Sequence, residues 1–207
     1  MRIIAGRFRG RTLVAPNGLE TRPTSALARG ALFEILRHRI EGARVADLFA
    51  GTGALGLEAL SRGARKVDFY ESGRPALMTL RKNIATLGVG NETRVIQGAL
   101  PDSLGAGEAY DLLIMDPPWR DGHELRVASR LVSRNRIAKG GLLVIESPRT
   151  EPLGEADFTK LGLTFDDRRA YGDTELRFFV REPSPPPEHL PAEPDDDQSD
   201  PLVGDQG

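Results

Sequence analysis

Short apolar runs alternate with amphipathic stretches along most of this 207-residue chain. The runs predict β-strands at the start of 44–60 and over 66–70, 93–96, 112–115 and 141–146. Apolar residues spaced three or four positions apart predict helices at the end of 44–60 and over 75–87 and about 124–137. Because residues 112–115 are all apolar, we expect that strand to be central and buried on both faces.

Residues 165–171 and 175–180 predict a further pair of strands, joined by the short turn 172–174. Strands joined by so few residues run antiparallel, whereas strands joined through helices run parallel. We therefore predict an α/β fold, a doubly wound Rossmann-like sheet closed by an antiparallel C-terminal pair. Ligands of such sheets bind at the carboxyl ends of the strands.

The first 40 residues predict a small attachment to this sheet. Residues 3–14 indicate a short hairpin with bends at Gly6 and Gly10. Apolar positions from 28 to 36 then predict an amphipathic helix, capped by Thr24 or Ser25. The attachment is basic, because a single acid accompanies five arginines in the first 22 residues: Arg2, Arg7, Arg9, Arg11 and Arg22.

An alternating strand would place Arg7, Arg9 and Arg11 on one face. Such a ribbon can bind the phosphates of a nucleic acid, since arginine pairs with phosphate bidentately. A solvated sheet edge is the alternative, because charged side chains commonly protect edge strands.

Composition narrows the chemistry. Cysteine is absent, which excludes disulfides, thiolate metal sites and a cysteine nucleophile. The three histidines lack metal-ligand spacing, so we expect no metal site. We expect a cytoplasmic protein, since no apolar run approaches the ~20 residues of a membrane span and the N-terminus lacks a signal-peptide pattern.

Residues 183–207 predict a disordered acidic tail, with seven acids, no lysine or arginine, and few apolar residues. Subtracting these seven from the chain's 30 acidic residues leaves 23 acidic against 28 basic residues in 1–182. The body is therefore mildly basic, although the whole chain carries a formal charge of −2.

The glycine turn Gly51-x-Gly53-x-x-Gly56 fits two cofactors. It matches the dinucleotide fingerprint, and Glu71 follows Gly51 by 20 residues, where an acid binds ribose hydroxyls. Asp47 argues for the other cofactor, because a carboxylate repels pyrophosphate but suits the amino group and sulfonium of S-adenosylmethionine. The alternative is that neither acid binds a cofactor: Asp47 caps the turn and Glu71 is a solvated strand end.

A second motif, Asp116-Pro117-Pro118-Trp119, ends the apolar strand 112–115. The prolines fix the backbone, and Asp116 offers a hydrogen-bond acceptor. Trp119, the single tryptophan, offers a flat face for stacking. Together they could hold a flipped-out base by its ring and exocyclic amine. Core packing of Trp119 and an ordinary proline loop are the alternatives.

With these motifs, the chain resembles the bacterial 16S ribosomal RNA guanine-N2 methyltransferases, the RsmD family. The resemblance runs from Met1 to about Arg181 and includes the N-terminal run 1–6, Arg9-Gly10-Arg11, Arg22-Pro23-Thr24, the stretch 47–59 and Asp116-Pro117-Pro118. The N-terminal motifs distinguish this family from DNA adenine methyltransferases, which share the Asp/Asn-Pro-Pro motif.

The motifs and the resemblance together imply a site for S-adenosylmethionine and one for ribosomal RNA or an assembling small subunit. The implied cofactor contacts are Asp47, Phe49, Ala50, Gly51, Gly53, Glu71, Ser72, Gly98 and Ala99. The implied RNA contacts are Arg2, Arg7, Arg9, Arg11, Arg22 and Thr24. The implied catalytic residues are Asp116, Pro117, Pro118 and Trp119.

Four residues depart from the family pattern. Ala26, Leu27 and Gly30 stand where relatives usually carry polar residues. Gly98 stands where many relatives place Asp or Asn near the cofactor's adenine, so a backbone amide at 98 or 99 would have to serve.

The sequence also leaves rival functions open. The nearest is a DNA adenine-N6 or other amino methyltransferase; the others are a nicotinamide-dependent oxidoreductase and a non-catalytic RNA-binding assembly factor. For the guanine-N2 methyltransferase we expect a monomer with three parts: an RNA-contacting attachment over 1–40, a methyltransferase domain over 41–182 and the tail over 183–207.

Overall fold

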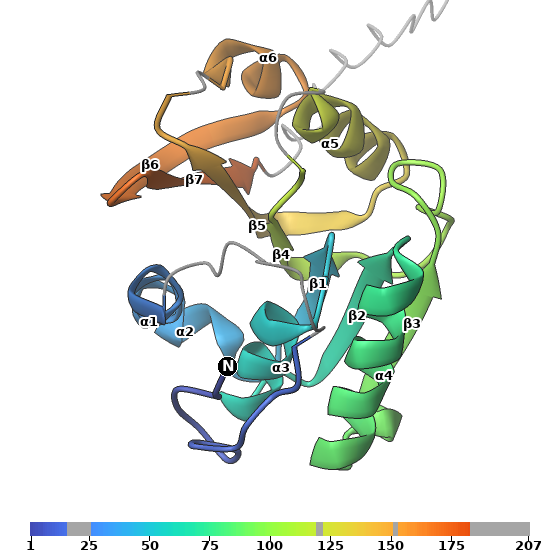
Figure 1. Ribbon diagram of the computed structural model, residues 1–207. Coiled ribbons are helices and arrows are strands. Elements are labelled where there is room, and N and C mark those ends of the chain that lie inside the picture. Colours follow the sequence, from blue (N-terminus) through green and yellow to red (C-terminus); the bar gives the residue numbers. More distant parts are fainter. Residues whose placement is uncertain (16–25, 119–121, 151–152, 183–207) are drawn as a thin grey trace, which may run out of the picture.

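Seven strands form one sheet in the order β3-β2-β1-β4-β5-β7-β6 in the computed structural model (Figure 1), which describes residues 1–15, 26–118, 122–150 and 153–182. The strands are β1 (Arg44–Leu48), β2 (Lys66–Glu71), β3 (Thr93–Gln97), β4 (Tyr110–Met115), β5 (Ile137–Pro148), β6 (Leu163–Tyr171) and β7 (Thr174–Arg181). Strands β1 to β5 pair in parallel, and β7 lies antiparallel between β5 and β6. The predicted doubly wound sheet with its antiparallel C-terminal pair is therefore confirmed.

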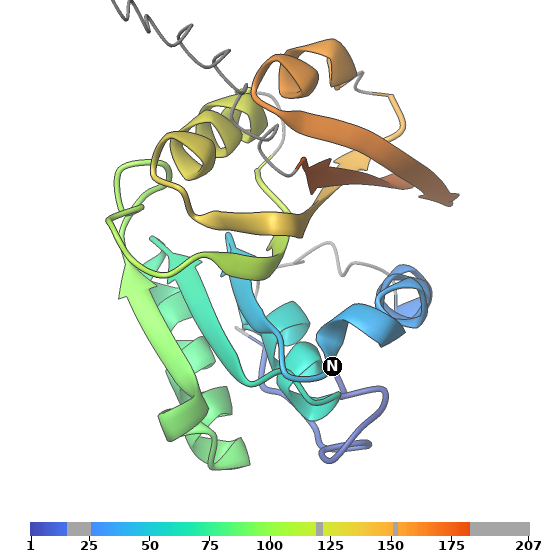
Figure 2. The ribbon, with the colours of Figure 1, turned by 180° about the vertical axis from the view of Figure 1, so that it is seen from behind.

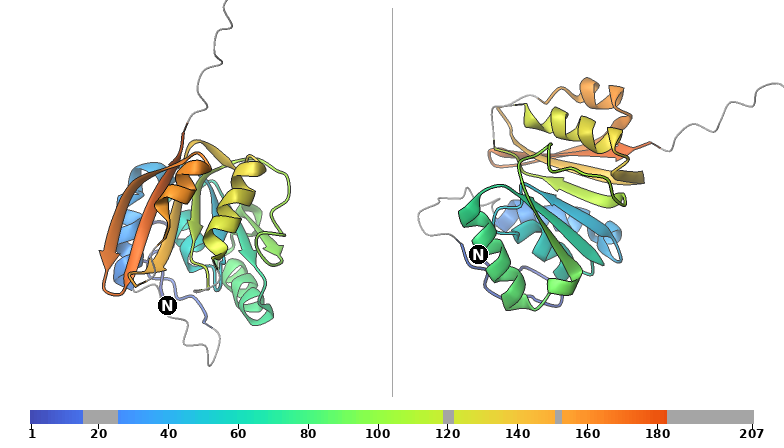
Figure 3. Two further views of the ribbon diagram at one scale, coloured as in Figure 1. Left: turned by 90° about the horizontal axis from the view of Figure 1, so that it is seen from above. Right: turned by 90° about the vertical axis from the view of Figure 1, so that its right-hand side faces the viewer.

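Helices cover both faces of the sheet (Figures 2 and 3). They are α1 (Ala26–Ile35), α2 (Arg37–Ile40), α3 (Ala54–Ser61), α4 (Arg74–Leu87), α5 (His123–Ser133) and α6 (Glu155–Lys160). Side chains alternate across each strand, so Val45 of β1 packs with α1 to α4, whereas Ala46 and Leu48 pack with α5 and α6. None of the described helices is long and apolar enough to cross a membrane.

The end of one helix and the presence of another differ from the prediction. Helix α5 ends at Ser133 instead of continuing to 137, because Asn135 is left-handed (φ 52°) and the Arg136 amide closes on the Leu131 carbonyl at 2.8 Å. Residue Ile137 then begins β5. Helix α6 was not predicted; it is six residues long, too short for a periodic pattern.

The N-terminal segment, defined here as residues 1–15, folds back on itself and packs against α3. Its apolar residues Ile3 and Leu13 are each 2% exposed and join the core on the α1 to α4 side. The buried Glu58 carboxylate of α3 accepts hydrogen bonds from the Ile4 amide at 2.7 Å and the Ala5 amide at 3.0 Å. The predicted attachment is therefore fixed to the main domain by buried contacts.

The hairpin in this segment is shorter than predicted. Its bridge pairs Arg2 with Thr12, and residues 5–10 form turns in which Gly6 and Gly10 have φ of 80° and 81°. The Arg7 amide also bonds outward, to the Ser61 carbonyl of α3 at 2.7 Å. The expectation that Arg7, Arg9 and Arg11 alternate along a strand is therefore wrong, because the glycine turns and this contact replace a regular ladder.

A buried polar network ties the amino ends of the central strands together on the α5 side. The Asp68 carboxylate of β2 pairs with the Arg44 guanidinium of β1 at 2.8 Å and accepts a hydrogen bond from the Tyr110 hydroxyl of β4 at 2.7 Å. The Arg136 guanidinium donates to the same hydroxyl at 2.6 Å. Pairing of this kind offsets the free-energy cost of burying charged groups.

Candidate active site

Three of the five residues in the glycine turn between β1 and α3 are left-handed. Phe49, Gly51 and Gly53 have φ of 64°, 55° and 81°. A bulky residue such as Phe49 is rarely left-handed, and such strain clusters at functional sites. The backbone at Phe49 is therefore held in a conformation that its side chain does not favour.

Gly53 and Gly56 are required by packing beneath the turn. A Cβ at Gly56 would lie 2.3 Å from Phe69 Cε1, and one at Gly53 would lie 2.4 Å from Leu80 Cδ1. The predicted close approach of helix α3 to the neighbouring strand is thus confirmed at Gly56. Gly51 meets no atom within 4 Å on the side where a Cβ would stand.

The Glu71 carboxylate, at the end of β2, holds the turn from the side. One oxygen accepts a hydrogen bond from the Gly51 amide at 2.7 Å, and the other accepts from the Ser72 and Gly73 amides at 2.8 and 2.6 Å. Three backbone amides therefore bind the Glu71 carboxylate beside the turn. Glu71 is more than a solvated strand end.

Asp47, near the end of β1, is 1% exposed beneath the same turn. Its carboxylate accepts a hydrogen bond from the Gly56 amide at 2.8 Å. Asp47 therefore does cap the turn, which is the structural role given above as the alternative to cofactor binding. Burial raises the pKa of Asp47 to about 8, and the nearby Glu71 adds to the rise. A buried acid with a raised pKa gains most from a cationic partner.

Asp116 follows β4 directly and lies next to two other acids. Burial raises the pKa of Asp116 well above its ordinary value, and the charges of Glu146 and Asp47 raise that pKa further. Glu146 ends up beside Asp116 because β4 and β5 pair with Met115 opposite Ile145. Acids thus stand at the carboxyl ends of four adjacent strands: Glu71 (β2), Asp47 (β1), Asp116 (β4) and Glu146 (β5).

Sequence reasoning found three of these four acids and missed Glu146, which is 4% exposed. The available signal was its position as the last residue of the apolar run 141–146. We call Glu71, Asp47, Asp116 and Glu146 the acid cluster. Four carboxyl groups at the carboxyl ends of adjacent strands suit a ligand that carries positive charge.

The rest of the Asp-Pro-Pro motif follows Asp116 at the carboxyl end of β4. The Asp116 amide donates to the Leu48 carbonyl at 3.4 Å, which ties the motif to the end of β1. Pro117 is buried and Pro118 is exposed. Trp119, expected to stack on the target base, lies outside the described residues.

Of the two amides expected near the cofactor's adenine, one is already occupied. The Gly98 amide donates to the Glu71 carbonyl at 3.0 Å. Gly98 has a φ of 155°, and a Cβ there would lie 2.9 Å from Ser103 Cβ, so this backbone disfavours the Asp or Asn of relatives. The Ala99 amide remains as the candidate.

The predicted RNA-contacting residues that the structure describes differ in their contacts. Arg7 forms an ion pair with Glu92, and Arg11 donates to the Thr86 carbonyl at 3.3 Å. Arg2 and Arg9 are exposed. Arg22 and Thr24 lie outside the described residues, as does the acidic tail.

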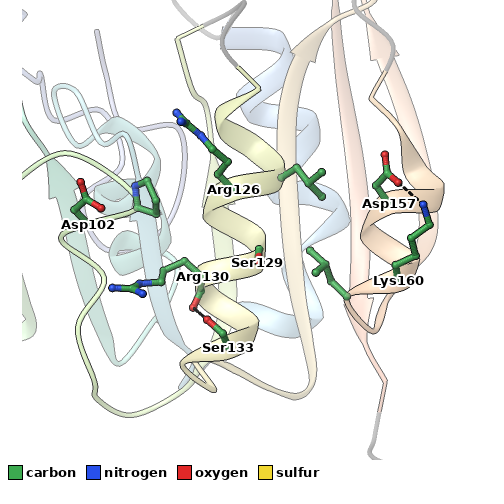
Figure 4. Close-up of a pocket in the computed structure, with 10 residues that line it drawn as sticks. Asp102, Arg126, Ser129, Arg130, Ser133, Asp157 and Lys160 are labelled. Atoms are coloured by element: carbon green, nitrogen blue, oxygen red, sulfur yellow. Dashed lines mark hydrogen bonds and ion pairs between the residues drawn. The ribbon is translucent and has the colours of Figure 1, made fainter.

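A groove of about 650 Å³ lies apart from the acid cluster, between α5, α6 and the loop after β3 (Figure 4). Arg126 and Arg130 project from α5 toward Asp102, and Lys160 pairs with Asp157 at 2.7 Å on α6. None of the acid cluster lines this groove.

Taken together, the doubly wound sheet, the glycine turn after β1, the acid ending β2 and Asp-Pro-Pro after β4 define a Rossmann-like S-adenosylmethionine-dependent methyltransferase. A protein-family model described as "Conserved hypothetical protein 95" matches residues 1–180. The chain belongs to this family, the RsmD family.

Three relatives illustrate the similarity. "Ribosomal RNA small subunit methyltransferase D" of Escherichia coli K12 is 38% identical over 147 residues, which are 71% of this chain and 74% of that protein. The Haemophilus influenzae protein of the same name is 35% identical over 157 residues, covering 74% and 81%. A solved structure of yhhF from Escherichia coli superposes with a TM-score of 0.77 at 34% identity, covering 88% and 98%.

Proposed function

We propose that the protein transfers a methyl group from S-adenosylmethionine to the exocyclic N2 amine of a guanine in 16S ribosomal RNA of the small subunit. The observation that carries the proposal is the placement of Asp116-Pro117-Pro118 beside Asp47, which itself lies near Glu71, so that an amine-accepting motif stands next to acids that suit a cation. The relatives' names, which specify small-subunit ribosomal RNA, support the substrate.

The acid cluster fits the cofactor. The Asp47 carboxylate would hold the α-amino group, and Glu71 would accept hydrogen bonds from the ribose hydroxyls while it keeps Gly51 in place. The Ala99 amide would face the adenine. When bound, S-adenosylmethionine supplies an electrophilic methyl group, so the protein's task is to align the acceptor amine with it.

Asp116 and the Pro117 carbonyl would accept hydrogen bonds from the guanine amine. These bonds orient the nitrogen lone pair and stabilise the positive charge that develops on nitrogen during transfer. Trp119 would stack on the base. No obligatory base is assigned, because the proton can leave after the methyl group has been transferred.

The rival functions fit the site less well. A nicotinamide dinucleotide would bring a pyrophosphate to strand ends that carry four acids, which the charge disfavours. DNA adenine methylation lacks support from the relatives, which are named for ribosomal RNA. RNA binding by a non-catalytic assembly factor would not account for the acids gathered at the carboxyl ends of the strands.

We assign RNA contact to residues 1–40 and chemistry to 41–182, with 183–207 as a tail that is dispensable for chemistry. We further propose that the protein works as a monomer in the cytoplasm, where small subunits assemble. Light scattering of the protein alone and with RNA tests the oligomeric state.

The decisive experiment gives the protein methyl-labelled S-adenosylmethionine with three acceptors in parallel: free 16S RNA, small-subunit particles lacking the methylation, and duplex DNA. Nuclease digestion and chromatography then identify the labelled nucleoside. We expect N2-methylguanosine from RNA or particles, and no label with the Asp116→Ala variant. Label in N6-methyladenine, or none in any acceptor, would contradict the proposal.

A further inference from the structure

Asn83 of α4 links the N-terminal segment to the glycine turn. Its amide nitrogen donates to the Val14 carbonyl at 3.1 Å and to the Thr52 carbonyl at 3.0 Å, and its oxygen accepts from the Val14 amide at 2.8 Å. The residue is 1% exposed. Breaking such bonds leaves buried polar groups unpaired, which is costly.

The two partners of Asn83 belong to different parts of the proposed site. Thr52 lies inside the glycine turn, between Gly51 and Gly53. Val14 lies near the end of the N-terminal segment, to which we assign RNA contact. The turn is thus held at two successive residues by one strand-helix unit: Glu71 binds Gly51 before α4 begins, and Asn83 binds Thr52 from within α4.

The segment is fixed to the domain along its length. Glu58 holds its first part, Arg11 donates to the Thr86 carbonyl one turn beyond Asn83, and Asn83 holds Val14. A ligand that stabilises the segment in this position therefore also stabilises Asn83 and the Thr52 carbonyl that Asn83 binds.

We propose that Asn83 is a positioning residue that couples RNA binding to cofactor binding. This inference rests on the proposed function. RNA bound to the segment opposes the local opening of its contacts and so keeps Asn83 bonded to the Thr52 carbonyl, and the cofactor then loses less conformational freedom on binding the turn. Coupling is reciprocal, so the cofactor strengthens RNA binding by the same factor.

The test measures the Kd of S-adenosylhomocysteine, which cannot donate a methyl group, with and without saturating unmethylated RNA. We expect RNA to tighten wild-type binding about tenfold, within the usual range of such coupling. Asn83→Ala should bring the ratio close to one. Asn83→Asp should do the same, because a carboxylate still accepts from Val14 but cannot donate to either carbonyl.

Thr86→Ala is the matched control on α4. Its hydroxyl bonds within the helix, to the Lys82 carbonyl at 2.8 Å, and the backbone carbonyl that Arg11 contacts is kept. This variant should retain the wild-type ratio. Should Asn83 variants unfold, hydrogen exchange on the wild-type protein replaces them: RNA should slow exchange at residues 51–56 as well as in the segment.

Separate outcomes overturn the two claims. Equal cofactor affinity with and without RNA, in a preparation that methylates RNA, would overturn the coupling and leave the proposed function standing. A wild-type ratio that persists in both Asn83 variants would overturn the role of Asn83. Failure to methylate any RNA would remove the proposed function, and the coupling with it.

Discussion

The Glu71 carboxylate accepts a hydrogen bond from the Gly51 amide at 2.7 Å, so the end of β2 fixes the turn that follows β1. The residue proposed to bind the cofactor's ribose is therefore also a support of the cofactor turn. Its removal should weaken cofactor binding in two ways, by losing a ligand contact and by freeing the Gly51 backbone.

Glu71→Ala should raise the Kd for S-adenosylmethionine at least about tenfold, equivalent to ~1.4 kcal/mol. Isothermal calorimetry measures this directly, and Asp166→Ala, which removes an exposed acid of β6, is the control. Unchanged affinity would show that Glu71 does not bind the ribose.

Asp116→Ala should abolish methyl transfer and leave cofactor binding largely intact, because Asp116 is assigned to the target amine. We expect single-turnover rates to fall at least about a hundredfold. Retention of more than about a tenth of the wild-type rate, a loss of only ~1.4 kcal/mol, would contradict the assignment.

Cofactor binding should weaken as the pH falls below about 8. The pKa of Asp47 is raised to about 8 in the free protein, so below that pH the acid is mostly protonated and must lose its proton to pair with a cation. Between pH 7.5 and 6 the affinity should drop by up to about tenfold per pH unit for one released proton.

Calorimetry in buffers of different ionisation enthalpy counts the released protons. Asp47→Asn should bind more weakly and with a flat pH dependence over this range. A slope that persists in this variant would assign the proton to another acid, with Asp116 the first candidate because its pKa is also raised.

Gly6→Ala should loosen the N-terminal segment, since its Cβ would lie 1.8 Å from the Ser61 carbonyl oxygen. We expect a loss of about 1–3 kcal/mol in the free energy of unfolding and weaker RNA binding. Gly10→Ala is a close control: its φ is 81°, against 80° for Gly6, but its Cβ would meet no atom within 4 Å. Equal effects of both variants in urea unfolding would mean that docking on α3 contributes nothing.

Arg9→Ala should weaken RNA binding and lower the salt slope by about one unit, the effect of one lost phosphate contact. All three arginines are exposed, but Arg7 pairs with Glu92 and Arg11 with the Thr86 carbonyl, so Arg9 is chosen. Binding of S-adenosylmethionine should not change. If Arg9→Ala affects RNA binding no more than Arg168→Ala on edge strand β6, the segment is only a protected edge.

Local patterns predicted the features that local forces determine. Periodicity identified β1 to β5 and helices α3 to α5, and the turn chemistry identified the β6–β7 hairpin. The end of α5 was misplaced because the apolar residues of 131–137 fit both a helix and the start of a strand, and the left-handed Asn135 decides between them.

Pairing between distant segments could not be predicted in the same way. Glu146 becomes part of the acid cluster through the register of β5 against β4, and Asn83 acquires its partners through residues 69 and 31 positions away. The segment's arginines were expected on one face because alternation is a strand property, but their placement depends on docking to α3. Apart from the position of Glu146 at the end of an apolar run, these results depend on tertiary contacts that local patterns do not specify.

The buried network at the amino ends of the strands has a consequence for the opposite end of the sheet. Contacts among Arg44, Asp68 and Tyr110 join β1, β2 and β4, so they help to fix the register of these strands. A slip of β4 by two residues would preserve its faces but move Asp116 about 7 Å along the sheet from Asp47. Weakening this network, at the opposite end of the sheet, should therefore make the spacing between Asp47 and Asp116 less uniform although neither residue is changed.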